Sequence, residues 1–229
     1  MTCCRGVNPS FPTSLQPAAD VRPRGSIVAM PVIIDDLPAL EWSHDEGEAA
    51  FDAATGALTL TARPGSDWIN DPLDGERRQG ATGLGFLAPD ELSFSARVAV
   101  TSRRSTFDAA VLTVWGDRDH WAKLCFELSP QGQAMIVSVV TNGPSDDCSS
   151  SVVAQASTCL RVVRTGEAWA FHSSDDGVRW TFVRVFRLDF PGPFRVGMMA
   201  QAPTGDTCVA VFDRIALGET VPRDLRDGS

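Results

Sequence analysis

The chain has 229 residues, a formal net charge of −9 and 43% hydrophobic residues. No apolar run approaches the roughly 18 residues that a membrane-spanning helix needs, which excludes an integral membrane protein of that type. The acidic balance offers no basic face, so a general nucleic-acid binder is excluded as well. One all-β sandwich domain can use this whole length.

The two ends of the chain are predicted to lie outside the folded domain. Residues 1–31 have four prolines between positions 9 and 23 and no hydrophobic periodicity, so we expect a disordered N-terminal tail. Residues 219–229 are expected to form a polar C-terminal tail. Residues 1–31 also lack the apolar stretch of a secretory signal, and the six cysteines form no C-x-x-C pair. We therefore expect a cytoplasmic protein with reduced thiols.

Between residues 32 and 218 the hydrophobic period is two, and nothing marks an internal domain boundary. Short alternating segments separated by turn residues are typical of an all-β sandwich or barrel, with little helix. Residues 143–151 are predicted to be a long polar loop. The predicted strands cover residues 57–63, 92–100, 107–115, 120–128, 134–141, 158–164, 167–172, 179–188, 194–201 and 207–217.

The segment 120–128 departs from a simple alternation. Its even positions are apolar, whereas its odd positions are Trp121, Lys123, Cys125 and Glu127, and Lys123 is the only lysine of the chain. A face that is aromatic and charged at once fits a groove that contacts a ligand. The alternative is that Lys123 and Glu127 each belong to a structural ion pair across the sheet. They lie about 13 Å apart along one strand, so their partners must come from other segments.

Candidate partners for these two charges are residues whose predicted strands or loops could lie beside residues 120–128. They are Arg161, His172, and Asp146 or Asp147.

An ordered set of short motifs runs from Gly65-Ser66-Asp67-Trp68 to Ala200-Gln201-Ala202-Pro203, with the W-x-K-x-x-x-E string of residues 121–127 at its centre. Over residues 39–217 the chain thereby resembles a family of uncharacterised proteins with a concanavalin-A-like β-sandwich, one of whose fungal members is described as a regulator of enolase. The resemblance implies a jelly roll of two antiparallel sheets with one concave face. Asp147 stands where family members often have Trp.

Catalysis and cofactors have little support in the sequence. Glycoside hydrolysis normally needs two carboxylates, and the E-x-D-x-x-E string of the glucanase branch of this architecture is absent. The adjacent Asp146 and Asp147 fall short of the 6–8 oxygens that Ca²⁺ takes. Gly83-x-Gly85 lies in a strand context with no following helix, so it is no phosphate loop. We expect no cofactor and no metal.

The sequence therefore predicts a non-catalytic module that binds a carbohydrate or a small metabolite on the concave sheet face. The alternative is a protein-interaction or regulatory module that acts on a metabolic enzyme, and a glycoside hydrolase is a third hypothesis. The tryptophans stay open to a second interpretation, as core or as groove wall. The predicted ligand-binding residues are Trp121, Lys123, Glu127, Trp115, Asp67, Trp68, Arg161 and Asp146.

Overall fold

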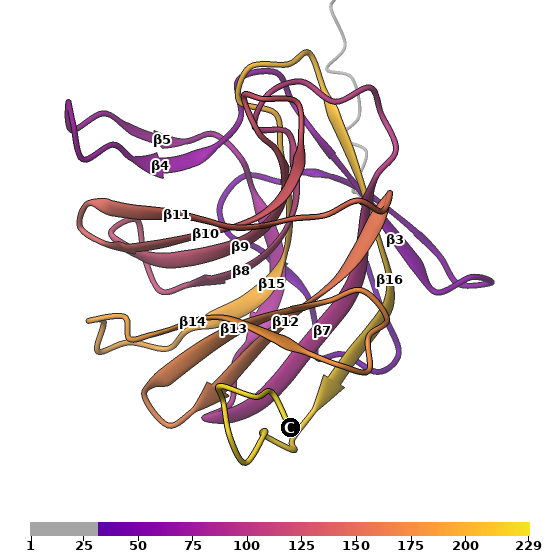
Figure 1. Cartoon of the computed structure of the whole chain (residues 1–229), viewed down its shortest axis with the longest axis vertical. Coiled ribbons are helices and arrows are strands. Elements are labelled where there is room, and N and C mark those ends of the chain that lie inside the picture. The colour runs from indigo at the N-terminus through magenta and orange to yellow at the C-terminus, as the bar shows by residue number, and fades with distance from the viewer. Residues whose placement is uncertain (1–31) are drawn as a thin grey trace, which may run out of the picture. The chain divides into compact units, whose positions relative to one another are not determined.

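The computed structural model describes residues 32–229, and the N-terminal tail predicted for residues 1–31 lies outside them. Within this part the strands are antiparallel and form two seven-stranded sheets and one two-stranded hairpin. The two large sheets confirm the predicted two-sheet sandwich (Figure 1). None of the described residues forms a helix long and apolar enough to cross a membrane.

We call the two seven-stranded sheets A and B. In spatial order sheet A contains β1 (Glu41–Trp42), β6 (Gly83–Leu87), β15 (Arg195–Gln201), β8 (Ala109–Trp115), β9 (His120–Leu128), β10 (Ala134–Asn142) and β11 (Ser145–Val152). Sheet B contains β14 (Thr181–Phe186), β13 (Ala168–Ser174), β12 (Ser157–Thr165), β7 (Glu91–Val100), β16 (Cys208–Gly218), β3 (Ala57–Ala62) and β2 (Glu48–Asp52).

The core lies between the two sheets and follows the period-two pattern of the strands. On β9 the even-numbered Ala122, Leu124 and Phe126 are 0–1% exposed and pack in this core with Leu160 and Val162 of β12. Because successive side chains of a strand point to opposite faces, the odd-numbered residues of β9 and β12 must lie on the outer faces of sheets A and B respectively. The sandwich thus has two outer faces.

A short hairpin covers part of the outer face of sheet A. Strands β4 (Trp68–Asn70) and β5 (Arg77–Gln79) pair with each other and lie on the side of sheet A that faces away from sheet B (Figure 1). The backbone N–H of Asn70 donates to Ser145 Oγ at 2.9 Å, and its side-chain Nδ2 donates to the Gly143 carbonyl at 2.7 Å. These contacts fasten the hairpin to the connection between β10 and β11.

The prediction of a loop over residues 143–151 is wrong. Residues 145–152 form β11, which pairs with β10 over most of its length and is the last strand of sheet A. Its sequence lacks apolar alternation because an edge strand has one neighbour and both of its faces reach solvent, so polar residues are tolerated there.

The last residues of the chain fold back onto the outer face of sheet B. In Figure 1 they form the yellow segment beyond β16, and their hydrogen bonds go to β12 and β13. The backbone carbonyls of Leu225 and Gly228 accept hydrogen bonds from His172 and Arg161, at 2.6 and 2.8 Å. Residues 219–229, expected to form a polar tail, thus include a segment that covers two side chains of sheet B.

Candidate functional site

The row of residues that drew attention in the sequence lies on the outer face of sheet A but is not an open groove along its length. Trp121, Lys123, Cys125 and Glu127 are 1%, 3%, 0% and 8% exposed. The hairpin β4–β5 lies above Trp121 and Lys123, and this layer explains how residues of mixed character can be buried on an outer face. The expectation of an accessible hollow at Lys123 is therefore wrong.

Lys123 has a complete set of hydrogen-bond acceptors beneath the hairpin. Its Nζ donates to Asp67 Oδ1 at 2.8 Å, to the Trp68 carbonyl at 2.7 Å and to Gln201 Oε1 at 2.9 Å. Burial by itself would lower the pKa of Lys123, but the nearby negative charges, first of all Asp67, raise it above the usual range. Lys123 is thus a charged residue that anchors the chain segment leading into β4.

Glu127 lies further along the same strand and is less well satisfied. Its Oε2 accepts one long hydrogen bond, 3.3 Å from Gln201 Nε2, which also donates to the Phe107 carbonyl. Desolvation raises the pKa of Glu127 to about 7, against the opposing effect of Lys123. Gln201 therefore connects the Lys123–Asp67 pair to a carboxyl group whose protonated form is favoured by burial.

The structure contradicts three of the four residues expected as partners of Lys123 and Glu127, namely Arg161, His172 and Asp146. Arg161 and His172 belong to the outer face of sheet B, on the opposite side of the sandwich, so neither can reach these charges. Asp146 is exposed and binds Arg184 at 2.8 Å. Of the two adjacent aspartates, Asp147 lies on the Lys123 face, because Asp147 and Lys123 both pair with Val139 in the strand register. Partial desolvation raises the pKa of Asp147.

The three tryptophans predicted to bind a ligand meet beside Lys123 and its hydrogen-bond acceptors. The ring of Trp68 lies 6.0 Å from that of Trp115 and 5.7 Å from that of Trp121, in edge-to-face arrangements. The indole N–H groups of Trp68 and Trp121 donate to backbone carbonyls at 2.6 and 3.2 Å. All three indoles line a pocket of about 170 Å³ together with Ser43, His44, Gln79, Gly116, Asp117, Arg118 and Arg195. We call it the tryptophan pocket.

Glycines of β6 make room for Trp115, one wall of this pocket. A Cβ atom on Gly85 would come within 2.7 Å of the Trp115 ring, and one on Gly83 within 3.5 Å. Glycine inside a strand often marks such a close approach. The Gly83-x-Gly85 pair therefore allows Trp115 to lie against the sheet, as one wall of the pocket.

The rim of the tryptophan pocket is polar and carries more positive than negative charge. Arg195 binds Glu41 at 2.9 Å. Asp117 is the one carboxylate among the lining residues, and it accepts hydrogen bonds from the Asp119 N–H and from His120 Nδ1 at 2.8 and 2.7 Å. Aromatic walls with a few polar groups at the rim are typical of small-molecule sites.

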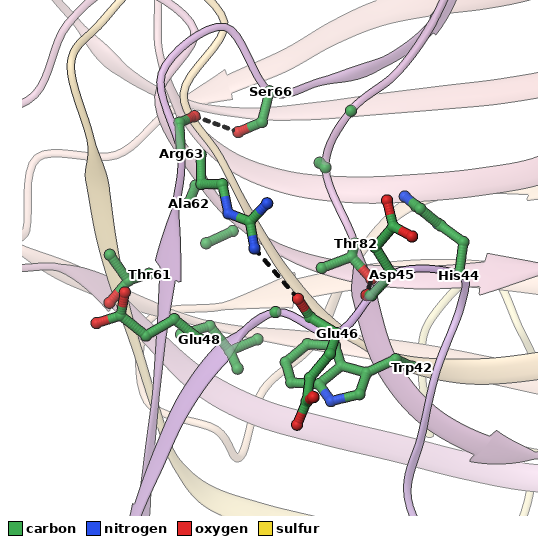
Figure 2. Close-up of a pocket in the computed structure, with 15 residues that line it drawn as sticks. Trp42, His44, Asp45, Glu46, Glu48, Thr61, Ala62, Arg63, Ser66 and Thr82 are labelled. Atoms are coloured by element: carbon green, nitrogen blue, oxygen red, sulfur yellow. Dashed lines mark hydrogen bonds between the residues drawn. The ribbon is translucent and has the colours of Figure 1, made fainter. Parts of the chain in front are cut away.

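A second pocket shares His44 with the first but is much smaller. Figure 2 shows it between the 42–48 segment and β3, with Arg63 directed toward the carbonyl of Glu46, to which it donates at 3.3 Å. Its volume of about 40 Å³ has space for only a few water molecules. Among residues 32–229, no group of three or more His, Cys, Asp or Glu is arranged to hold a metal ion.

Sequence reasoning missed two residues that complete the site. Gln201 was noticed only as part of a motif, although it accepts from Lys123 and faces Glu127. Asn70, which fastens the hairpin, carried no signal in the sequence. A polar residue at the end of an apolar strand such as β15 is the pattern that could have identified Gln201 as a partner for a buried charge.

The fold and the pocket define an antiparallel two-sheet β-sandwich with an aromatic pocket on one outer face. The chain belongs to the family described as "Protein of unknown function (DUF1349)", whose model matches residues 42–220. This confirms the resemblance found in the sequence.

The chain is similar to "Regulation of enolase protein 1" of Saccharomyces cerevisiae, with 29% identity over 174 residues that cover 75% of this chain and 86% of the relative. A crystal structure of a functionally unknown protein from Saccharomyces cerevisiae aligns with a TM-score of 0.71 and 27% identity, over 80% of this chain and 97% of that one. A xylan beta-1,4-xylosidase from Bacillus halodurans aligns with a TM-score of 0.60 and 16% identity, over 83% of this chain and 38% of that one. The last likeness shows the fold alone.

Proposed function

We propose that the protein is a non-catalytic binding module that takes a carbohydrate or a small metabolite into the tryptophan pocket. The observation that carries this proposal is the meeting of Trp68, Trp115 and Trp121 around one pocket with a polar rim. Indole faces offer apolar contact area to a sugar ring, and rim groups such as Gln79 and Arg195 can fix its orientation.

In this proposal the buried charges position the pocket rather than contact the ligand. Asp67 precedes Trp68 in the chain, and Lys123 binds both the Asp67 carboxylate and the Trp68 carbonyl. The ion pair therefore holds the backbone at the point where one wall of the pocket begins. Glu127 lies on the far side of Gln201 from this pair.

Glycoside hydrolysis has less support than binding. The chemistry uses two carboxyl groups that flank the scissile bond. Among the described residues, Asp117 is the one carboxylate that lines the tryptophan pocket, and its hydrogen bonds hold it to its own turn.

A glycan array and a metabolite library, screened by thermal shift, test the proposal. We expect a ligand that stabilises the wild type and loses at least about tenfold in affinity on Trp115→Ala, since a stacking aromatic wall is removed. Trp42→Ala is the matched control, because Trp42 lines only the smaller of the two pockets. Absence of any hit, or equal affinity in wild type and Trp115→Ala, would overturn the proposal.

A second candidate is a regulatory module that binds a metabolic enzyme in the cytoplasm. The observation that favours it is the name of the yeast relative, which describes regulation of enolase. Titration of purified enolase against this protein by biolayer interferometry tests it. Saturable binding supports the regulatory module, and its absence up to about 100 μM, a weak affinity for two proteins, counts against it.

A further inference from the structure

Arg161 is a buried guanidinium on the outer face of sheet B. It is 8% exposed and stacks on Trp180, with 4.3 Å between its Cζ and the ring centroid. Its Nη2 donates to the Gly228 carbonyl at 2.8 Å, while its buried Nε has no hydrogen-bond partner among residues 32–229. Burial lowers the pKa of Arg161 to about 10, so it remains charged at neutral pH.

Arg161 takes part in none of the ion pairs formed within residues 32–229. The segment that covers Arg161 contains two carboxylate side chains, Asp224 and Asp227, but neither forms an ion pair with it. Asp224 instead accepts a hydrogen bond from the Arg226 N–H, and Asp227 accepts from the N–H and hydroxyl of Ser229. A buried charge is normally paired, because the cost of removing it from water is otherwise uncompensated.

His172 lies directly beside Arg161 on the neighbouring strand and is fully buried. Its Nε2 is 2.6 Å from the Leu225 carbonyl. A carbonyl can only accept, so Nε2 carries the proton and Nδ1 carries an unpartnered lone pair. The imidazole and the guanidinium thus both direct N–H groups at backbone carbonyls of residues 224–229.

We propose that Arg161 and His172 form a binding site for a phosphate-like oxyanion, and that residues 224–229 cover this site. When the segment is displaced, Arg161 Nε, Arg161 Nη2 and His172 Nε2 become available as donors to one anion. An oxyanion supplies both the missing negative charge and the acceptors, whereas the two carbonyls supply acceptors only. This site is separate from the tryptophan pocket and independent of the function proposed for it.

Gly228 gives a way to open the site without altering its donors. It has a φ of +77°, and a Cβ atom there would lie 2.9 Å from Arg161 Nη2 and 2.9 Å from Trp180 Cβ. Gly228→Val therefore displaces the segment through both backbone strain and steric overlap. Gly132→Val is the matched control, because Gly132 has a similar φ of +76° and no atom within 4 Å of its Cβ position.

Isothermal titration calorimetry with inorganic phosphate at low ionic strength tests the proposal. The covered site of the wild type has only a small open population, which reduces its apparent affinity. We expect Gly228→Val to bind phosphate at least about tenfold more tightly than wild type and Gly132→Val to match wild type. Adding Arg161→Gln to Gly228→Val should abolish the gain.

Two results would overturn the proposal. One is phosphate binding that is equal in wild type and Gly228→Val, and the other is binding that survives Arg161→Gln. Hydrogen exchange in the wild type is a second measurement, which does not depend on the folding of any variant. Saturating phosphate should accelerate exchange of the Gly228 amide, which donates to the Asp224 carbonyl at 2.9 Å. Unchanged exchange at that amide would also contradict displacement of the segment.

Discussion

The two outer faces of the sandwich each contain a buried cation, and they differ in the acceptors and counter-charge that surround it. On sheet A, Lys123 has a carboxylate, a carbonyl and an amide oxygen as acceptors. On sheet B, Arg161 has one carbonyl and an indole face. Both residues are under 10% exposed. The comparison teaches that burial alone does not distinguish a structural charge from a ligand-binding one, because the difference lies in whether the protein itself supplies the opposite charge.

The covers of the two cations differ as well. The hairpin over Lys123 is fastened by Asn70 to the β10–β11 connection and by the buried Asp67 to sheet A. The C-terminal segment over Arg161 contacts sheet B through two backbone carbonyls and the stacking of Arg226 on Phe182. A segment with few buried contacts opens at lower free-energy cost than one tied by a buried network. We therefore expect the C-terminal segment over sheet B to open at a lower free-energy cost than the hairpin over sheet A.

Asp67→Asn is the substitution with the largest expected effect. It leaves the Lys123 ammonium buried without its counter-charge, which costs about 3–5 kcal/mol of unfolding free energy. Urea denaturation measures the loss. Asp213→Asn is the control, because the Arg97–Asp213 pair is partly exposed and should lose only about 1 kcal/mol or less. A loss for Asp67→Asn as small as that for Asp213→Asn would show that the Asp67 carboxylate does not compensate the buried charge of Lys123.

Gly85→Ala probes the Trp115 wall of the tryptophan pocket. The added Cβ would lie 2.2 Å from the Val196 carbonyl oxygen and 2.7 Å from the Trp115 ring. Since backbone of β15 must move, we expect a loss of about 2–3 kcal/mol. Gly80→Ala is the control, with its nearest atom at 3.7 Å. A stability of Gly85→Ala within about 0.5 kcal/mol of wild type, in the range of ordinary surface changes, would contradict the close packing of Trp115.

Glu127→Gln tests the electrostatics beyond the ion pair on the same face. Because the pKa of Glu127 is raised from its ordinary 4.5 to about 7, the folded state binds this proton more tightly than the unfolded state. Stability conferred by the protonated group is therefore lost as pH rises from about 4.5 to about 7. Between pH 5 and pH 8 we expect the wild type to lose about 2 kcal/mol relative to Glu127→Gln in urea denaturation. Parallel pH profiles would contradict a raised pKa.

The sandwich could be predicted from the sequence because apolar and polar residues alternate within each core strand. The odd row of β9 was also identified correctly as unusual, since Lys123 and Trp121 do not suit a solvent-facing position. Its burial could not be foreseen, because the cover comes from residues 68–79, which show no extended apolar pattern of their own. Partners such as Asp67 and Gln201 are distant in sequence, so only the pairing of strands in space brings them together.

The assignment of Arg161 to the same site as Lys123 failed for a related reason. Its strand was predicted correctly as residues 158–164, and the parity of Arg161 within that strand places it on an outer face. Period two indicates that a residue lies on an outer face without indicating which sheet owns that face. A sandwich has two such faces, and the sequence offered no means of choosing between them.

Arg161→Met has the smallest expected effect and gives the sharpest contrast with Asp67→Asn. The substitution removes a buried charge that no carboxylate of the described residues compensates, and it keeps an unbranched apolar side chain against Trp180. The lost hydrogen bond to the Gly228 carbonyl and the lost stacking are offset by the removal of the unpartnered Nε, so we expect a change within about 1 kcal/mol. Urea denaturation in chloride buffer measures this value, with phosphate left out so that no oxyanion can bind. A loss of about 3 kcal/mol or more, as for a paired buried charge, would mean that Arg161 holds sheet B and its cover together, and the two faces would then be alike. An unchanged free energy of unfolding would mean that Arg161 is not needed for stability, and ligand binding would then be the property that arginine has and methionine lacks at this position.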